Sequence, residues 1–239
     1  MSGPPIRIWR WGDPLGPLAA LLARGGVLAV PTESSYALAA DPRNPEGVAA
    51  VYRIKRRGAG KPLPVVAAGL GQLAGLGIDP DLPILAVLAH AAWPGPLTAV
   101  LPLTRPLPAA AGLPSLAVRV PAHDRLRTLL AELGSGLTAT SANHSGGAPA
   151  REPSAAAALL AGEDAALVDD GPLPGGPPST IVRWTPEGLE VLRRGSFPAP
   201  GLAALLAANK SNLPPVVGTY EDSGVAGSPR VPRKIEEEP

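Results

Sequence analysis

The segment 31–68 brings together side chains that suit the binding of phosphate groups. Four residues with side-chain oxygens directly follow the apolar stretch 27–30, namely Thr32, Glu33, Ser34 and Ser35. About twenty residues later comes a glycine-punctuated cluster of five cations, Arg53, Lys55, Arg56, Arg57 and Lys61. Because lysine and arginine are the residues that proteins use to neutralise phosphates, the segment is a candidate anion site.

Lys55 and Arg57 are the two cations that we assign to such a site. Asparagine, proline and glutamate at 44–46 predict a helix start, and the helix should end near residues 57–58. Positions two apart do not share a helix face, but both side chains can turn toward one cavity if the helix unwinds at Gly58. The competing interpretation is a solvated basic helix end that complements the helix dipole.

A second polar stretch, TATSANHSGG, occupies residues 138–147. In an extended strand alternate side chains share a face, so Ser141 and Asn143 should point the same way. The turn Ser145-Gly146-Gly147 would then offer backbone N–H groups to an anion. The competing interpretation is a polar strand end with an ordinary turn.

Arg119 lies inside the apolar strand pattern SLAVRVP at 115–121. A charge there needs a partner, because an unpaired buried charge is costly. Arginine can grip a carboxylate with two parallel hydrogen bonds, which indicates a ligand carboxylate. A structural partner, Asp124, Asp169 or Asp170, is the alternative. Together the three stretches describe a pocket for a ligand with phosphates and a carboxylate.

Other common catalytic arrangements do not fit the chain. Residues 58–61 (GAGK) resemble the end of a P-loop, but the first glycine is missing and Pro62 replaces the magnesium-binding hydroxyl. Residues 134–139 match a dinucleotide fingerprint by letters, but they follow a predicted helix and enter a strand, the reverse of the required order. The three histidines lack zinc-ligand spacing, and there is no cysteine and no G-x-S-x-G elbow.

Composition limits the partners and the compartment. The 239 residues carry a formal net charge of +1 and are 45% hydrophobic, which argues against a protein that coats nucleic acid. The N-terminus has no signal-peptide core, and prolines interrupt the apolar stretch 82–103, so we expect a cytoplasmic protein without a membrane span. We expect a catalytic domain over 1–208 and a Pro/Gly-rich flexible tail over 209–239.

Predicted helices and strands alternate along the chain. Helices are predicted at 14–23, 45 to about 57, 82–92, 124–133 and 154–161. Strands are predicted at 27–30, 63–68, 97–103, 116–120, 137–143, 166–169, 180–184 and 189–193. This alternation predicts an α/β fold, and the closely spaced late strands predict a mixed sheet.

Six blocks, in the same order, resemble the YrdC-like threonylcarbamoyl-AMP synthases between about residues 23 and 196. PTESSYALAADPRNPEGVAAVYRIKRRGAGKPLPV is similar to the family's P-T-[DE]-[ST]-x-Y-G-L segment with its K-x-R and K-P-L motifs. The later blocks are WPGPLTAVLP, LAVRVPAH, TATSANHSGG, VDDGP…PSTIV and VLRRGSF. The resemblance implies a twisted, mostly mixed open α/β sheet with flanking helices around a large, positively lined cavity. It indicates the short form of the family, without the extra C-terminal domain.

The resemblance also implies roles for single residues. ATP would be bound by Lys55, Arg57, Ser115, Ser141, Asn143 and Arg193, and catalysis would depend on Lys55, Arg57, Ser141 and Asn143. L-threonine would be bound by Thr32, Arg119, Ala139 (through its backbone) and Ser179, with Arg119 on the carboxylate. Ala37 and Ala39 replace glycines of the family, which argues against a special backbone angle there. Asp170 replaces the first glycine of its D-G-G.

The implied reaction joins L-threonine, bicarbonate and ATP to give threonylcarbamoyl-adenylate and pyrophosphate. Mg²⁺ would arrive with ATP and have no direct protein ligand. A transferase complex that modifies tRNA would be the partner, with a weak tRNA or double-stranded RNA contact. One alternative is a non-catalytic RNA-binding protein that uses the same basic cavity, although few aromatic residues are present for base stacking. The other is a carbamoyl-transfer relative that acts on a small metabolite.

Overall fold

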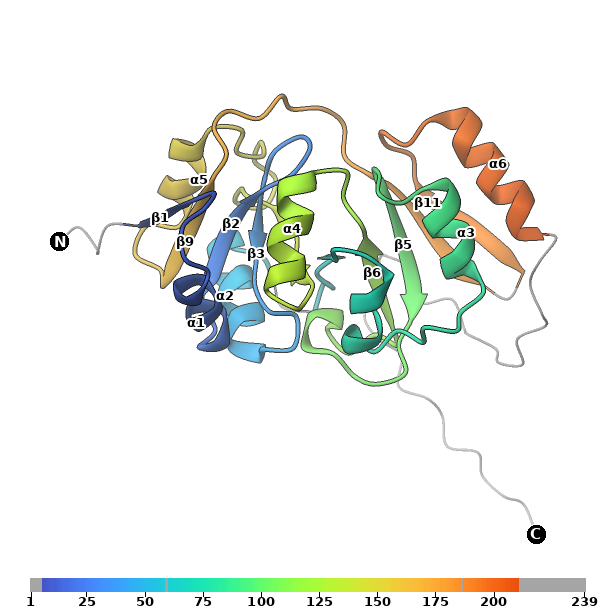
Figure 1. Ribbon diagram of the computed structural model, residues 1–239, viewed down its shortest axis with the longest axis horizontal. Coiled ribbons are helices and arrows are strands. Elements are labelled where there is room, and N and C mark those ends of the chain that lie inside the picture. The colour runs from blue at the N-terminus through green and yellow to red at the C-terminus, as the bar shows by residue number, and fades with distance from the viewer. Residues whose placement is uncertain (1–5, 59, 186, 211–239) are drawn as a thin grey trace, which may run out of the picture.

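The computed structural model describes residues 6–58, 60–185 and 187–210, and its strands form two mixed sheets that lie side by side (Figure 1). The first sheet contains, in order, β1 (Arg7–Arg10), β9 (Ala165–Asp169), β2 (Val27–Pro31), β3 (Tyr36–Ala39) and β8 (Thr140–Ser141). The second contains β11 (Gly188–Arg193), β10 (Thr180–Thr185), β5 (Leu97–Pro102), β6 (Ser115–Arg119), β4 (Val65–Val66) and β7 (Leu137–Thr138). The α/β class is confirmed, but the one open sheet that we expected is two.

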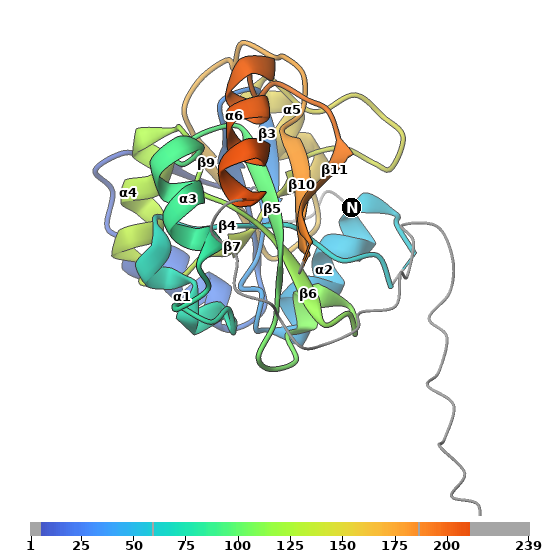
Figure 2. The same ribbon diagram turned by 90° about the vertical axis from the view of Figure 1, so that its right-hand side faces the viewer.

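Helices cover both faces of the first sheet. One face packs on α1 (Gly16–Ala23) and α4 (Asp124–Glu132), and the other on α2 (Pro45–Lys55) and α5 (Pro153–Leu159). At the far end of the second sheet, α3 (Ile84–Ala91) lies beside α6 (Ala199–Lys210) (Figure 2). Short 3-10 helices are η1 (Leu70–Gln72), η2 (Ala74–Leu76) and η3 (Pro108–Ala110). Among the described residues, no helix has the length and apolar character needed to span a membrane.

One short segment joins the two sheets. Thr138 pairs with β4 of the second sheet, whereas Thr140 and Ser141 pair with β3 of the first. Between them the Ala139 N–H donates to the Pro64 carbonyl at 2.7 Å. The continuous strand predicted over 137–143 is therefore wrong, because the chain changes sheets at Ala139.

The second sheet has one buried face and one partly exposed face. Leu116 and Val118 of β6 are buried, whereas Ser115, Ala117 and Arg119 are partly exposed. The alternation follows from the pleat of a strand, whose successive side chains point to opposite faces. The partly exposed face is thus lined by small, hydroxyl and charged side chains at β6, which suits ligand binding.

β1, β3 and α6 were not predicted, and β4 and α2 are shorter than predicted. β1 is a four-residue edge strand, and β3 reads YALA, with all four residues buried and no alternation. α6 begins just after the last predicted strand. β4 is confined to Val65–Val66, and α2 ends before residue 57. The tail predicted over 209–239 lies outside the described residues beyond 210.

Gly195 allows the chain after β11 to pack against the start of β10. A Cβ at this position would lie 2.2 Å from the Pro178 carbonyl oxygen and 2.5 Å from the Ser179 carbonyl carbon. We therefore expect Gly195→Ala to lower the free energy of unfolding by about 1–3 kcal/mol, because backbone atoms must move. Gly71→Ala, where a Cβ meets nothing within 4 Å, is the matched control in urea denaturation. Equal unfolding midpoints for the two variants would show that this close approach is not a constraint.

Candidate active site

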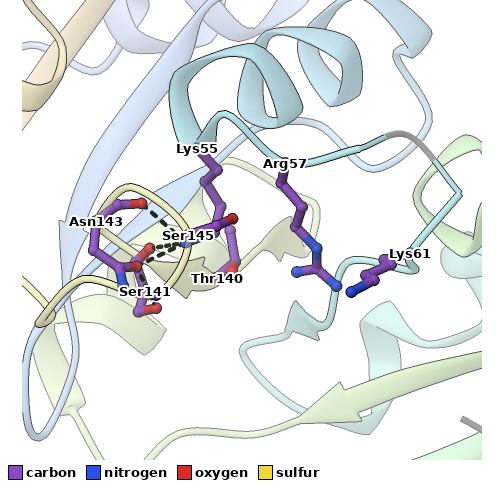
Figure 3. A pocket seen from close by; sticks show the side chains of 8 residues that line it. Lys55, Arg57, Lys61, Thr140, Ser141, Asn143 and Ser145 are labelled. Atoms are coloured by element: carbon purple, nitrogen blue, oxygen red, sulfur yellow. Dashed lines mark hydrogen bonds between the residues drawn. The ribbon is translucent and has the colours of Figure 1, made fainter. Parts of the chain in front are cut away.

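The C-terminal end of α2 places two of the predicted cations. Arg56 stops the helix in a left-handed conformation with φ 49°, and the Arg57 N–H donates to the Tyr52 carbonyl at 3.0 Å. The unwinding that we expected at Gly58 is therefore wrong, since the turn lies at Arg56. The turn still has the predicted consequence: Lys55 and Arg57 line one pocket, whereas Arg56 is exposed (Figure 3).

The Lys55 ammonium is buried, and only 4% of the residue is exposed. Its Nζ donates to the Ser141 carbonyl at 2.6 Å, to the Asn143 carbonyl at 3.2 Å and to Asn143 Oδ1 at 2.8 Å. Three acceptors match the three donors of a lysine ammonium. Burial, with Arg57 nearby, lowers the pKa of Lys55 to about 8. A solvated helix end is thus wrong for Lys55, which connects α2 to the 141–143 segment.

Ser141 and Asn143 point the same way, as the strand alternation predicts. Ser141 Oγ donates to Asn143 Oδ1 at 2.7 Å, although β8 itself ends at Ser141. Asn143 Nδ2 in turn donates to the Gly147 carbonyl. Asn143 Oδ1 therefore receives hydrogen bonds from both Ser141 and Lys55, which orders the loop at the pocket.

The turn 145–147 is less available to an anion than we expected. The Ser145 N–H donates to the Lys55 carbonyl at 2.9 Å, and the Gly147 N–H donates to the His144 carbonyl at 2.9 Å. Two of the three N–H groups of the predicted anion nest are thus engaged within the protein. The prediction is wrong for these two groups, which instead close the end of α2 and the turn itself.

A pocket of about 260 Å³ lies between the end of α2 and this loop (Figure 3). It is lined by Lys55, Arg57, Lys61, Thr140, Ser141, Asn143, Ser145 and Gly146. Sites that enclose a whole small molecule usually measure roughly 300–1,000 Å³, so this pocket suits the phosphates of a nucleotide better than the complete nucleotide. The large positively lined cavity implied by the resemblance is not shown.

Arg57 and Lys61 project from the chain after α2 into the pocket (Figure 3). In the part of the chain that the structure describes, neither side chain has an ion-pair or hydrogen-bond partner. The Tyr52 hydroxyl donates to the Lys61 carbonyl and holds its backbone. By contrast, Arg53 of the same cation cluster is neutralised by Glu163. Two uncompensated charges in one pocket favour a multiply charged anion.

Arg119 has a partner in the first sheet. Its side chain is 14% exposed, and its Nη2 lies 3.1 Å from Oε2 of Glu33, in the turn between β2 and β3. The aspartates proposed as structural partners bind other groups: Asp124 binds Arg127, Asp169 accepts from the Gly171 N–H, and Asp170 binds Trp11, His123 and Arg125. The choice of an aspartate was therefore wrong, and the acidic partner is Glu33.

Ser179 and Arg193 meet near Arg119 on the partly exposed face of the second sheet. The hydroxyl oxygens of Ser179 and Thr98 are 2.8 Å apart, and Arg193 Nη2 donates to the Ser179 carbonyl at 2.8 Å. Ala99 of β5 pairs with Val118 of β6 in an antiparallel register, so Thr98, the residue before Ala99, lies opposite Arg119. Two segments that are distant in the sequence, 98–119 and 179–193, thus contribute to one polar cluster.

Thr32, Ala139 and Ser115 complete the predicted set, and none of the three lines the 260 Å³ pocket. Thr32 is buried, and its Oγ1 donates to the Ser35 carbonyl at 2.7 Å. Because the Ala139 N–H is engaged, a backbone contact from Ala139 to a ligand has to come from its carbonyl. Ser115 lies at the opposite end of β6 from Arg119. The structure thus brings the predicted phosphate residues together, apart from Ser115 and Arg193.

The three positions that differ from the family have ordinary structural roles. Ala37 and Ala39 are buried in β3 and pair regularly with β2, and neither has a positive φ. No special backbone angle is needed there, as their side chains predict. Asp170 accepts hydrogen bonds from Trp11 Nε1 at 2.6 Å and Arg125 Nη1 at 2.8 Å, and so ties the N-terminal segment to α4.

Two of the three histidines, His123 and His144, hydrogen-bond to protein groups. His123 Nδ1 accepts from the Leu126 N–H at the start of α4, so its Nε2 must donate to Asp170. His144 Nδ1 donates to the Ile54 carbonyl at 3.0 Å. Within the described residues, no group of three histidine or acidic side chains could hold a metal ion.

Three residues beside the candidate site were not assigned from the sequence: Glu33, Lys61 and Thr98. Glu33 and Lys61 belong to the polar and basic stretches within 31–68, in which the sequence pattern assigns the binding roles to other residues. Thr98 lies in an apolar strand pattern, and only the pairing of β5 with β6 and β10 places it beside Arg119 and Ser179.

The chain matches a family model and curated proteins over most of its length. The Sua5/YciO/YrdC model, described as "Telomere recombination", matches residues 20–195. A threonylcarbamoyl-AMP synthase of Alkalilimnicola ehrlichii is 40% identical over 174 residues, which cover 71% of this chain and 90% of that protein. A threonylcarbamoyl-AMP synthase of Xanthomonas campestris pv. campestris is 41% identical over 183 residues, with coverages of 73% and 94%.

A solved structure supports the same relationship. The crystal structure of P. abyssi Sua5 complexed with L-threonine is similar with a TM-score of 0.73 and 28% sequence identity. The match covers 92% of this chain but only 66% of the Sua5 chain, so the chain spans just under two thirds of that longer relative. The family match, the curated relatives and the fold agree, and the chain belongs to the Sua5/YciO/YrdC family.

Proposed function

We propose that the chain is an L-threonylcarbamoyladenylate synthase, which condenses L-threonine, bicarbonate and ATP to threonylcarbamoyl-AMP and pyrophosphate. The relatives that carry this activity in their names support the reaction. The observation that carries the proposal is the pocket in which Arg57 and Lys61 have no anionic partner among the described residues. A triphosphate supplies the multiple negative charge that such a pocket favours.

The phosphates of ATP would lie against Arg57 and Lys61, with Ser141 and Asn143 on the opposite wall. Lys55 adds positive charge to the pocket and holds the 141–143 segment through its three hydrogen bonds. Ser115 and Arg193, which lie outside this pocket, would contact other parts of the nucleotide. The small size of the pocket supports this division of the ATP contacts.

L-threonine would bind at the partly exposed face of the second sheet. Arg119 would take the carboxylate, because a guanidinium matches its two oxygens. The Ser179 hydroxyl, the Ala139 carbonyl and Thr32 would surround the rest of the amino acid. The hydrogen bond from Arg193 to the Ser179 carbonyl supports the proposal, since it joins a proposed threonine-binding residue to a proposed ATP-binding residue.

The chemistry requires two substrates to be held in line and charge to be neutralised. The threonine amine takes the carbon of bicarbonate as carbon dioxide, and the amine proton leaves with the hydroxide of bicarbonate as water, which gives a carbamate. A carbamate oxygen then bonds to the α-phosphorus of ATP as the bond between the α-phosphorus and the α,β-bridging oxygen breaks, and the β- and γ-phosphates leave together as pyrophosphate. No covalent bond to the protein is needed, so catalysis rests on orientation and on the cations that face the phosphates.

Mg²⁺ would accompany ATP rather than occupy a site of its own. Among the described residues, no group of three acidic or histidine side chains could hold a metal ion, and the side chains that line the pocket offer hydroxyl and amide oxygens to a cation. Such a donor set fits an ion that is held mainly by phosphate oxygens and water. Bound in this way, Mg²⁺ would neutralise charge on the departing pyrophosphate.

The adenylate would be consumed in the cytoplasm by a transferase complex that modifies tRNA, with at most a weak contact to tRNA or double-stranded RNA. The activity would reside in a domain over 1–208, followed by a tail over 209–239. The net charge of +1 supports a small-molecule enzyme over a protein that binds RNA tightly.

The purified chain should release pyrophosphate from ATP only when L-threonine and bicarbonate are both present, without added tRNA. Mass spectrometry should find threonylcarbamoyl-AMP as the product, because the adenylate forms before any transfer step. If the chain instead binds RNA tightly and forms no pyrophosphate with Mg²⁺, threonine and bicarbonate, the RNA-binding alternative holds and the enzyme proposal fails.

Replacing Arg57 or Lys61 by alanine should reduce kcat/KM for ATP, by on the order of a hundredfold for Arg57, because each removes an unpaired charge from the pocket. Unfolding midpoints should stay near those of the unmodified protein, since neither side chain has a structural partner among the described residues. Arg56→Ala is the matched control, because Arg56 is exposed and does not line the pocket. Equal reductions of kcat/KM for ATP in all three variants would indicate that the overall positive charge of the segment matters, and not the positions of Arg57 and Lys61 in the pocket.

A further inference from the structure

Glu33 connects the two sheets next to the proposed threonine site. Its Oε1 accepts from the Ala122 N–H at 2.6 Å, and its Oε2 lies 3.1 Å from Arg119 Nη2. Glu33 belongs to the turn between β2 and β3, whereas Ala122 follows β6. The carboxylate is therefore anchored by a backbone group and presents its second oxygen to the guanidinium.

The Glu33–Arg119 contact is an ion pair with an incomplete set of hydrogen bonds. Oε2 of Glu33 is buried and has no donor in hydrogen-bond geometry, although Arg119 Nη2 is 3.1 Å away. A two-pronged pair, which would occupy two guanidinium nitrogens at once, is absent between these two residues. Glu33 thus neutralises Arg119 from one side, and the other N–H groups of the guanidinium keep their capacity to bind a ligand.

Burial explains why Arg119 needs this fixed acid. Its side chain is 14% exposed, and no other ion pair of Arg119 occurs within the described residues. A charged group in such surroundings is costly without a counterion, and a long arginine side chain without a fixed contact loses a defined orientation. Glu33 supplies both the charge and a fixed point.

We infer that Glu33 is the positioning residue for Arg119: it holds the guanidinium so that the free N–H groups face the carboxylate of the amino-acid substrate. The inference rests on the proposed function, in which Arg119 binds that carboxylate. It assigns a role in amino-acid affinity to a residue that does not itself contact the substrate.

The Glu33–Arg119 contact can also be expected to have the opposite effect, which is to weaken the binding of the substrate carboxylate. A carboxylate beside Arg119 competes with the substrate carboxylate for positive charge, and its removal would then tighten binding. The Ala122 N–H argues against this effect, because it holds Glu33 in place and prevents it from following the guanidinium. Positioning and competition predict changes of opposite sign in the Kd for L-threonine when Glu33 loses its charge, so one substitution distinguishes them.

Glu33→Gln removes the charge but keeps an amide oxygen that can accept from the Ala122 N–H. Calorimetry should show the Kd for L-threonine raised roughly tenfold, the size expected for loss of one charge-assisted contact. L-threoninamide, which lacks the carboxylate, should bind with nearly the same Kd to both proteins. Glu163→Gln is the matched control: Glu163 also pairs with an arginine, Arg53, but it is not one of the residues proposed to bind L-threonine.

Arg119 provides the internal reference. Arg119→Lys should weaken L-threonine more than ATP, because a point charge cannot replace a planar fork. In that background Glu33→Gln should add little, since a positioning residue acts through the group that it positions. Additive losses would mean that Glu33 acts independently of Arg119 and would overturn the inference. If Glu33→Gln fails to fold, Glu33→Asp, which keeps the charge but is shorter, should still raise the Kd for L-threonine and not for threoninamide.

Two further outcomes separate the inference from the proposed function. Equal or tighter binding of L-threonine to Glu33→Gln, with the unmodified protein binding normally, overturns the positioning role and leaves the enzyme proposal intact. Absence of L-threonine binding to the unmodified protein, with or without an ATP analogue, overturns the proposed function and the inference with it.

Discussion

The buried ammonium of Lys55 is the interaction on which the candidate phosphate pocket depends. It joins the last residue of α2 to three oxygens of the 141–143 segment, and the loop returns the contact through the Ser145 N–H. Burial makes the charge costly, as the lowered pKa of Lys55 indicates, and the three acceptors offset that cost. The pocket walls are therefore set before a ligand arrives, so that a bound triphosphate meets charges already in place.

The same principle of ordering before binding applies across the two sheets. The 137–141 segment leaves the second sheet and enters the first at Ala139, and Glu33 reaches from the first sheet to Arg119 of the second. The proposed phosphate and amino-acid residues thus sit on one framework with two cross-links. A reaction that joins two substrates without a covalent enzyme intermediate gains most from such fixed relative placement.

Local signals predicted local structure well, and contacts between distant residues were the part that they could not predict. Asn44 accepts from N–H groups of α2 as its place before a proline and a glutamate indicates. The break at Ala139 could not be read from TATSANHSGG, because pairing with two different sheets depends on residues far away in the chain. For the same reason the burial of Lys55 could not be predicted, since the loop that buries it comes about ninety residues later. The partner of Arg119 could not be predicted for the same reason: Asp124, Asp169 and Asp170 were the proposed structural partners, and the structure pairs Arg119 with Glu33.

Proton uptake on nucleotide binding tests the central claim, that the Lys55 ammonium organises the phosphate pocket, most directly. The pKa of Lys55, about 8 in the free protein, should rise when phosphates bring negative charge, so that binding takes up a proton at pH values above the free pKa. Calorimetry with a non-hydrolysable ATP analogue, in buffers of different ionisation enthalpy, should give an uptake of about half a proton at pH 8, little at pH 6, and none attributable to this site in Lys55→Arg. The same uptake in Lys55→Arg and the unmodified protein at pH 8, or no uptake in either, would contradict the account.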